Sequence, residues 1–132
     1  MSENYRLDQP TAITCPDCGG ALKVEHNENL LQYRCHIGHV LTAETMLAAQ
    51  FSVLEAKLAA CLAGLNERAE LCRQMSEAAR QQGQPTDALE AAHKEALERA
   101  LVVKNLLESE WAGTNRAYVR QAMGFVSVPR PL

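Results

Sequence analysis

The sequence is poor in aromatic residues and has no large excess of charge of either sign. Only 5% of its 132 residues are aromatic, although 47% are apolar. Alanine and leucine are abundant between residues 43 and 112, which favours packed helices over a sheet core. The formal net charge of -3 provides no basic surface to attract a nucleic-acid backbone. The composition therefore predicts a mainly α protein that does not bind nucleic acid.

Long hydrophobic segments are also missing. No stretch reaches the roughly 18 uninterrupted apolar residues typical of a membrane-spanning helix. The first six residues, MSENYR, lack the apolar core of a secretory signal. We therefore expect a cytoplasmic protein without a membrane segment. In that reducing compartment, five cysteines are better explained by metal binding and buried thiols than by disulfides.

Known catalytic motifs are absent as well. The sequence contains no Gly-x-Ser-x-Gly elbow, no phosphate-binding glycine loop and no His-Glu-x-x-His motif. It therefore predicts a protein that is not an enzyme, with neither catalytic residues nor an organic cofactor.

Three cysteines and a histidine near the N-terminus form the most specific motif. Cys15 and Cys18 bound a tight turn that is followed by two glycines, and Cys35 precedes His39 by four positions, giving C-x2-C-x16-C-x3-H. This arrangement is typical of a closed, tetrahedral structural zinc site with three thiolates and one imidazole. We expect one Zn²⁺ per chain, bound by Cys15, Cys18, Cys35 and His39.

His36 is the alternative to His39 as the fourth ligand. Adjacent residues rarely point at one ion, so His36 competes poorly beside Cys35, whereas Gly38 allows a turn that brings His39 back.

The expected ion also has a role in folding. About 30 residues with so few large apolar side chains cannot form a core without a metal.

A long helical hairpin is predicted after the zinc motif. Thr42 is the expected N-cap of the first helix, Gly83 and Pro85 are expected to end it, and Thr86 is the expected N-cap of the second helix. The first helix carries apolar residues at heptad spacing, interrupted only by Arg68. The predicted seam consists of residues 47, 51, 54, 58, 61, 65, 68, 72, 75 and 79.

The second helix, predicted to end near Trp111 or Ala112, has more apolar surface than one partner helix can cover. One stripe runs through Leu89, Ala92, Ala96, Ala100, Val103 and Leu107. Leu97, Leu101, Val102 and Leu106 widen the apolar surface beyond that stripe. We therefore expect a homodimer in which two hairpins form a four-helix bundle.

Cys61 and Cys72 are expected to be buried thiols on the first helix, and His93 and Arg68 to be partnered residues within the bundle.

The predicted organisation of the chain has four segments. These are a flexible segment at 1–10, a zinc-ribbon-like β knob of three short strands at 11–41, the hairpin at 42–112 with its turn near 83–86, and a short helix with an irregular tail at 113–132.

Three stretches give the sequence a family resemblance. CPDCGGAL (15–22), YRCHIGH (33–39) and LTAETML (41–47), with the Ala/Leu/Glu-rich helix that follows, resemble a C-terminal extension of some chemotaxis-type protein-glutamate methylesterases. The similarity covers residues 14–107. It implies a role in bacterial chemosensory or two-component signalling and the same four metal ligands. Because the catalytic and receiver domains have no counterpart here, it does not imply methylesterase activity.

These observations favour a non-enzymatic, zinc-stabilised dimerisation or protein-interaction module, acting as an adaptor or scaffold in bacterial signalling. The alternative is a transcription regulator that combines a zinc knob with a coiled-coil hairpin and inserts the hairpin tip into RNA polymerase. In that alternative, the tip spans residues 81–87, with Asp87 as the acidic contact. A third alternative is an enzyme with an unrecognised site, which an open metal coordination position would favour.

Overall fold

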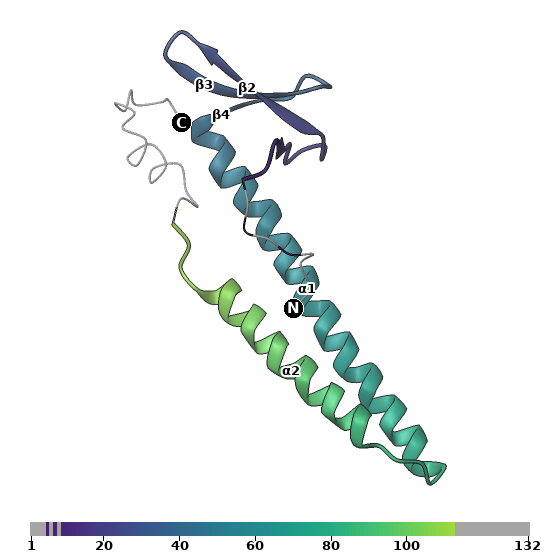
Figure 1. Cartoon of the computed structure of the whole chain (residues 1–132). Coiled ribbons are helices and arrows are strands. Elements are labelled where there is room, and N and C mark those ends of the chain that lie inside the picture. Colours follow the sequence, from purple (N-terminus) through teal and green to yellow (C-terminus); the bar gives the residue numbers. More distant parts are fainter. Residues whose placement is uncertain (1–4, 6, 8, 113–132) are drawn as a thin grey trace. The chain divides into compact units, whose positions relative to one another are not determined.

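The structure is a computed structural model that describes residues 5, 7 and 9–112. Its described part is mainly helical, with a small antiparallel sheet followed by two helices (Figure 1). The chain divides into two compact units, one formed by Met1–Phe51 with Ala112–Leu132 and the other by Ser52–Trp111, and each unit is described by itself. The elements are β1 (Ile13–Thr14), β2 (Ala21–Asn27), β3 (Leu30–Cys35), β4 (Val40–Thr42), α1 (Ala43–Gln81) and α2 (Asp87–Glu108).

The sheet has four strands in the order β1-β2-β3-β4, each antiparallel to the next. The prediction of three strands was therefore wrong. The two edge strands are only two and three residues long, which is too short to give an alternating pattern. β2 and β3 are joined by the two-residue turn at Glu28 and Asn29, where Glu28 has a positive φ of 58°.

One face of the sheet forms a small core. The pairing of Leu22 with Cys35 and of Val24 with Tyr33 places these four side chains on the same face. The core is completed by the first turns of α1, which contribute the buried side chain of Met46. Its buried members are Cys15, Leu22, Cys35 and Met46, with Tyr33 and Leu41 packed against them. Two of the four buried side chains are thus cysteines of the metal motif.

The two ends of α1 are defined by local hydrogen bonds. At the start, the Thr42 hydroxyl oxygen lies 3.3 Å from the Thr45 backbone N–H, as expected for an N-cap. At the end, Gly83 has a φ of +69° and its N–H donates to the Arg80 carbonyl, while the Gln84 N–H donates to the Ala79 carbonyl. These paired bonds form a Schellman motif, in which glycine is the favoured residue at the left-handed position.

Small side chains line the contact between α1 and α2, which lie side by side in the second unit (Figure 1). The buried positions are Ala69, Cys72 and Ser76 on α1 and Ala96, Ala100 and Val103 on α2. The predicted stripe on α2 is confirmed at its three central positions. The predicted seam on α1 is buried at Cys72, but it was wrong by one residue at two positions, because Ala69 and Ser76 are buried in place of Arg68 and Met75. Small side chains allow the helices to approach closely, so size as well as hydropathy selects the seam.

The remaining predictions for the hairpin have mixed outcomes. His93 is partnered as predicted, because its Nδ1 lies 2.8 Å from the Ala69 carbonyl oxygen. Cys72 is buried, but Cys61 is exposed, so the prediction of two buried thiols was wrong for Cys61. Arg68 is exposed and has no ion pair with another described residue, contrary to expectation.

The caps of α2 also differ from the prediction. Thr86 precedes the helix, but its side chain makes no capping hydrogen bond. The helix ends at Glu108 rather than at residue 111 or 112, because Ser109 is extended. The Trp111 indole N–H donates to the Leu106 carbonyl and so satisfies an acceptor in the last turn.

By length and composition alone, α1 meets the requirements for a helix that crosses a membrane. A single helix of this kind is a weak indication, since core helices of other proteins pass the same test. The cytoplasmic location therefore stays a prediction. The predicted short helix and tail at 113–132 lie outside the described residues, as does most of the predicted flexible segment before residue 9.

We predict that Gly83→Ala lowers the free energy of unfolding by about 1–2 kcal/mol, because alanine is strained at a left-handed φ. Urea denaturation followed by circular dichroism measures this effect. Gln84→Ala, one residue later, is the matched control. It keeps the backbone N–H that bonds to Ala79 and should change the stability by less than about 0.5 kcal/mol. Equal effects of the two substitutions would contradict the assignment of Gly83 to the helix stop.

Candidate metal centre

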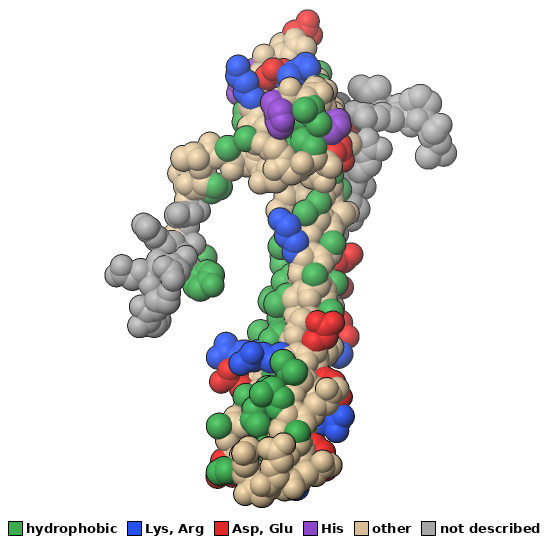
Figure 2. Space-filling view, turned by 90° about the vertical axis from the view of Figure 1, so that its right-hand side faces the viewer, with side chains coloured by type: hydrophobic (Ala, Val, Ile, Leu, Met, Phe, Trp, Pro, Cys, Tyr) green, Lys and Arg blue, Asp and Glu red, His purple; other side chains and the backbone are tan. Residues whose placement is uncertain are grey.

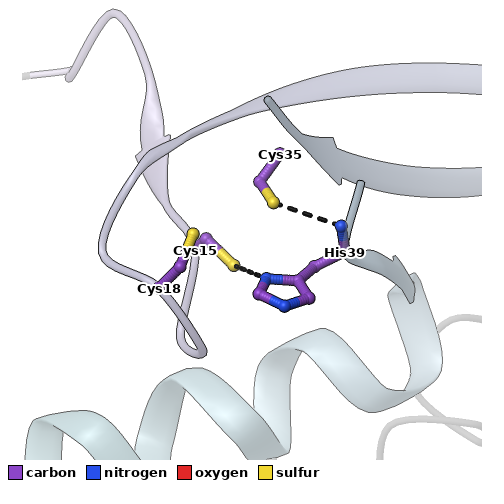
Figure 3. Close-up of side chains that lie close together, drawn as sticks. All are labelled: Cys15, Cys18, Cys35 and His39. Atoms are coloured by element: carbon purple, nitrogen blue, oxygen red, sulfur yellow. Dashed lines mark hydrogen bonds between the residues drawn. The ribbon is translucent and has the colours of Figure 1, made fainter. Parts of the chain in front are cut away.

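The four residues of the metal motif come from loops at one end of the sheet. Cys15 directly follows β1, Cys18 lies in the turn before β2, Cys35 ends β3 and His39 directly precedes β4. One ligand atom from each residue lies within 4.8 Å of the other three. Figure 3 shows these side chains pointing toward one another. The structure therefore brings together the four residues that the sequence singled out.

The spacing of these atoms suits one tetrahedral metal ion. With metal–sulfur bonds of about 2.3 Å and metal–nitrogen bonds of about 2.0–2.1 Å, neighbouring ligand atoms of a tetrahedral zinc site are about 3.5–3.8 Å apart. The Cys15 Sγ atom lies 3.8 Å from the His39 Nδ1 atom. The largest separation within the group, 4.8 Å, exceeds this range by only about 1 Å. A metal ion can thus be accommodated with small side-chain movements.

A tight turn presents the first two thiols. The Gly19 N–H donates to the Cys15 carbonyl across 2.9 Å, and the Cys15 N–H donates to the Gly20 carbonyl across 2.6 Å. Gly19 has a φ of +77°, a conformation that other residues rarely adopt. The local sequence Cys-Pro-Asp-Cys-Gly-Gly therefore folds into a knuckle because glycine stands where the chain reverses.

The second turn, from Cys35 to His39, is built in a similar way. The Gly38 N–H donates to the Cys35 carbonyl, and the Cys35 N–H donates to the His39 carbonyl. The His39 N–H lies 3.2 Å from the Cys35 sulfur, to which it donates a hydrogen bond (Figure 3). Gly38 has a φ of +97°, which provides the turn expected from the sequence.

His36 does not belong to the group of ligand atoms. Its ring lies over Gly20, where an added Cβ atom would be 2.5 Å from the His36 Cε1 atom. Gly20 therefore leaves room for the His36 ring, and a larger residue at this position would require the exposed ring to move aside. Sequence reasoning did not find this contact, because the local pattern carries no signal for a ring that packs on a backbone 16 residues earlier.

Backbone N–H groups make two of the thiols more acidic than usual. Burial acts to raise the pKa of Cys35, but hydrogen bonds from the His39 and Ile37 N–H groups outweigh it and bring the pKa down to about 7. Burial likewise opposes ionisation of Cys15, yet the Cys18 N–H and other donors hold its pKa below the ordinary value. Both sulfurs are therefore prepared to bind a cation as thiolates.

The neighbouring sulfurs raise the pKa values of the other two ligands, His39 and Cys18. A hydrogen bond with Cys15 raises the pKa of His39. The Gly20 N–H favours ionisation of Cys18, but burial and the neighbouring sulfurs of Cys15 and Cys35 outweigh it and raise the pKa of Cys18. In the absence of a cation, the three thiols cannot all ionise easily. A bound dication would remove this conflict by replacing the protons.

The four ligands differ in how far they are buried. Cys15 and Cys35 are only 1% and 3% exposed, His39 is half-buried, and Cys18 is exposed. If the bound ion were tetrahedral, these four ligands would fill its coordination sphere. Within the described ranges, this is also the only cluster of histidine, cysteine and acidic side chains that suits a metal ion.

We predict that His39→Ala strongly reduces the amount of metal that stays bound per chain. The loss of a direct ligand should weaken binding by more than the roughly 10–100-fold effect of losing an outer-shell partner. His36→Ala is the control and should retain the metal, because its ring lies outside the ligand group. Elemental analysis after dialysis measures both variants. Loss of the metal from His36→Ala, but not from His39→Ala, would reverse the assignment.

No family model, no curated protein and no solved structure matches this chain. The geometry of the metal centre and of the hairpin therefore carries the functional argument, together with the resemblance in the sequence motifs.

Proposed function

We propose that this chain is a non-enzymatic, zinc-stabilised dimerisation and protein-interaction module that acts as an adaptor or scaffold in bacterial signalling. The observation that carries the proposal is a closed cluster of four ligands in a protein whose helical hairpin exposes a large apolar surface. A metal ion in the ligand cluster would hold the small sheet together. The exposed apolar surface of the hairpin would bind another protein chain.

Zinc is the metal that this donor set fits best. Three soft thiolates and one imidazole select zinc over magnesium or calcium, which prefer oxygen ligands. Iron in a rubredoxin-like site requires four thiolates. Cys61 and Cys72, the only other cysteines, lie on α1 outside the ligand group.

The role of the ion is proposed to be structural because the sheet has so little core of its own. Apart from two metal-motif cysteines, Leu22 and Met46 are the only buried members of the core cluster. A core of this size cannot hold a four-stranded sheet against the loss of chain entropy. The zinc ion would supply the missing stabilisation by joining two turns that are distant in sequence.

The interaction role follows from exposed apolar side chains on the hairpin. Figure 2 shows apolar side chains open to solvent among charged ones in the helical part. Leu71, Met75, Leu97, Leu101, Val102 and Leu106 are each between 43% and 61% exposed. Apolar surface of this extent on a helical hairpin is typical of one half of a four-helix bundle, which supports the proposed homodimer.

The proposed place in bacterial chemosensory or two-component signalling depends on the sequence resemblance. The residues that carry it include the two turns of the metal centre, 15–22 and 33–39, and the start of α1 at 41–47. Co-purification from a bacterial lysate that returned only metabolic enzymes would argue against this assignment.

Removal of zinc is predicted to unfold the sheet while α1 and α2 keep most of their helical structure. Hydrogen exchange before and after chelation measures this directly. The amides of β2 and β3 should lose their protection, whereas amides near Ala69 and Ala96, at the buried helix contact, should keep theirs. The dimer measured by sedimentation should survive chelation. Loss of protection in the hairpin at the same chelator concentration would contradict the proposal that the two parts are separable.

The exposed hairpin tip favours a second candidate function, the transcription regulator that binds RNA polymerase. Residues 81–85 and Asp87 are all exposed, as an insertion into another protein would require. Under this alternative, Asp87→Ala should abolish polymerase binding in a pulldown with purified enzyme, because an acidic contact is lost. Glu77→Ala, on α1 outside the tip, is the control and should bind like the unmodified chain. Absence of binding by the unmodified chain would exclude the alternative.

A further inference from the structure

The two flanks of the helical hairpin differ in how their charges are used. On one flank, α1 carries Glu70, Arg73, Glu77 and Arg80, in ion pairs of 2.8 Å (Arg73–Glu70) and 3.0 Å (Arg80–Glu77). A third ion pair of 2.8 Å joins Arg80 to Glu90 on α2 and so identifies the matching flank of α2. At helical spacing this flank of α2 continues through residues 94, 97, 101, 104 and 108, and includes the Lys104–Glu108 pair. We call this side the ion-pair flank.

The opposite flank carries large apolar side chains, one ion pair of 3.4 Å between Arg99 and Glu95, and Arg68, which has no ion pair with another described residue. Its residues on α1 are Gly64, Arg68, Leu71 and Met75, and on α2 they are Ala88, Glu95, Arg99, Val102 and Leu106. We call this side the apolar flank. Arg68 forms no ion pair with any residue in the described part of the chain, in contrast to Arg73 and Arg80 across the hairpin.

We infer that the apolar flank binds the same flank of a second copy of this chain, with the two-fold axis parallel to the helices. The inference rests on the proposed function, which takes the chain to be a dimer, and adds which face is buried and in which orientation. Each α1 would then pack against α2 of the second copy. All neighbouring helices in the resulting bundle are antiparallel.

Charge complementarity supports this orientation. The hydrogen bond between His93 and the Ala69 carbonyl places the middle of α1 level with residues 93–96 of α2. A two-fold axis parallel to the helices keeps these levels, so that Arg68 of one copy meets Glu95 of the other. Glu95 pairs with Arg99 of its own helix at 3.4 Å, so Arg68, which has no ion pair within the described residues, would join that pair in a three-membered charge network twice in each dimer. An axis perpendicular to the helices at the level of Arg68 would instead bring Arg68 near its own counterpart, which is unfavourable.

The sizes of the side chains fit the same orientation. Near the hairpin tip, Leu71 and Met75 on α1 are large, whereas Ala88 on α2 is small. Farther from the tip, Val102 on α2 is large and lies level with Cys61 on α1, about one helical turn from the small Gly64, which lies level with Arg99. A Cβ atom at Gly64 would meet nothing within 4 Å in the single chain, so that space is open for a side chain of the second copy. A large residue would therefore meet a small one near the tip, and Val102 would lie within about one helical turn of the open space at Gly64.

Sedimentation equilibrium of the full-length, zinc-loaded chain tests the inference with two adjacent residues. Val102→Lys, on the apolar flank, should raise the dimer dissociation constant by about tenfold or more. Leu101→Lys, on the ion-pair flank, is the matched control and should change it by less than about threefold. The native residues are similarly exposed, at 61% and 55%. Circular dichroism checks that both variants keep their helical content.

A charge exchange tests the orientation. Arg68→Glu should weaken the dimer by about tenfold, because it opposes Glu95 of the second copy, and adding Glu95→Arg should restore most of the affinity. A dimer that is unaffected by Val102→Lys, weakened equally by Leu101→Lys, or not restored by the exchange would overturn the inference while leaving dimerisation in place. A monomeric unmodified chain would overturn both the inference and the proposed dimerisation, and would leave residues 113–132 or another protein as the cover of this flank.

Discussion

The sheet depends on the close approach of three thiols and one imidazole, whose ligand atoms lie within 4.8 Å of one another. In the absence of a cation the three thiols cannot all ionise easily, because each thiolate disfavours its neighbours. A dication bound by the cluster would remove this conflict and stabilise the folded sheet. Two of its members, Cys15 and Cys35, are also buried members of the apolar core. A metal ion held there would therefore be tied to the core as well as to the loops.

Much of the metal centre could be predicted from the sequence because ligand spacing and turn glycines are local signals. The four residues, Gly38 at the second turn and the glycine stop of α1 follow from the order of residues along the chain. The packing of His36 on Gly20 could not be predicted, because it joins two turns that come together only in the folded sheet. The number of strands could not be predicted for a different reason. The two shortest strands have only two or three residues, which are too few to show an alternating pattern.

The helical seam shows where hydropathy alone misleads. The heptad pattern that includes Cys61, Arg68 and Met75 is present, but those residues are exposed, and the buried contact runs through Ala69, Cys72 and Ser76. A helix with two apolar stripes offers two seams, and the smaller side chains select the one that a close antiparallel neighbour uses. The predicted seam therefore contains residues from both stripes, Cys72 from the buried one and Arg68 and Met75 from the exposed one. The Ser76 hydroxyl has no hydrogen-bond partner in the described part, so this close contact contains a buried polar group that does not stabilise it.

The close approach of His36 to Gly20 has a consequence for the position of the His36 ring. An added methyl group at position 20 would lie 2.5 Å from the His36 Cε1 atom, so the methyl group and the ring cannot occupy these positions together. His36 is exposed, so its ring can turn toward solvent while the backbone of both turns stays in place. The second glycine of the Cys-Pro-Asp-Cys-Gly-Gly motif therefore determines where the ring of the residue after the third cysteine rests.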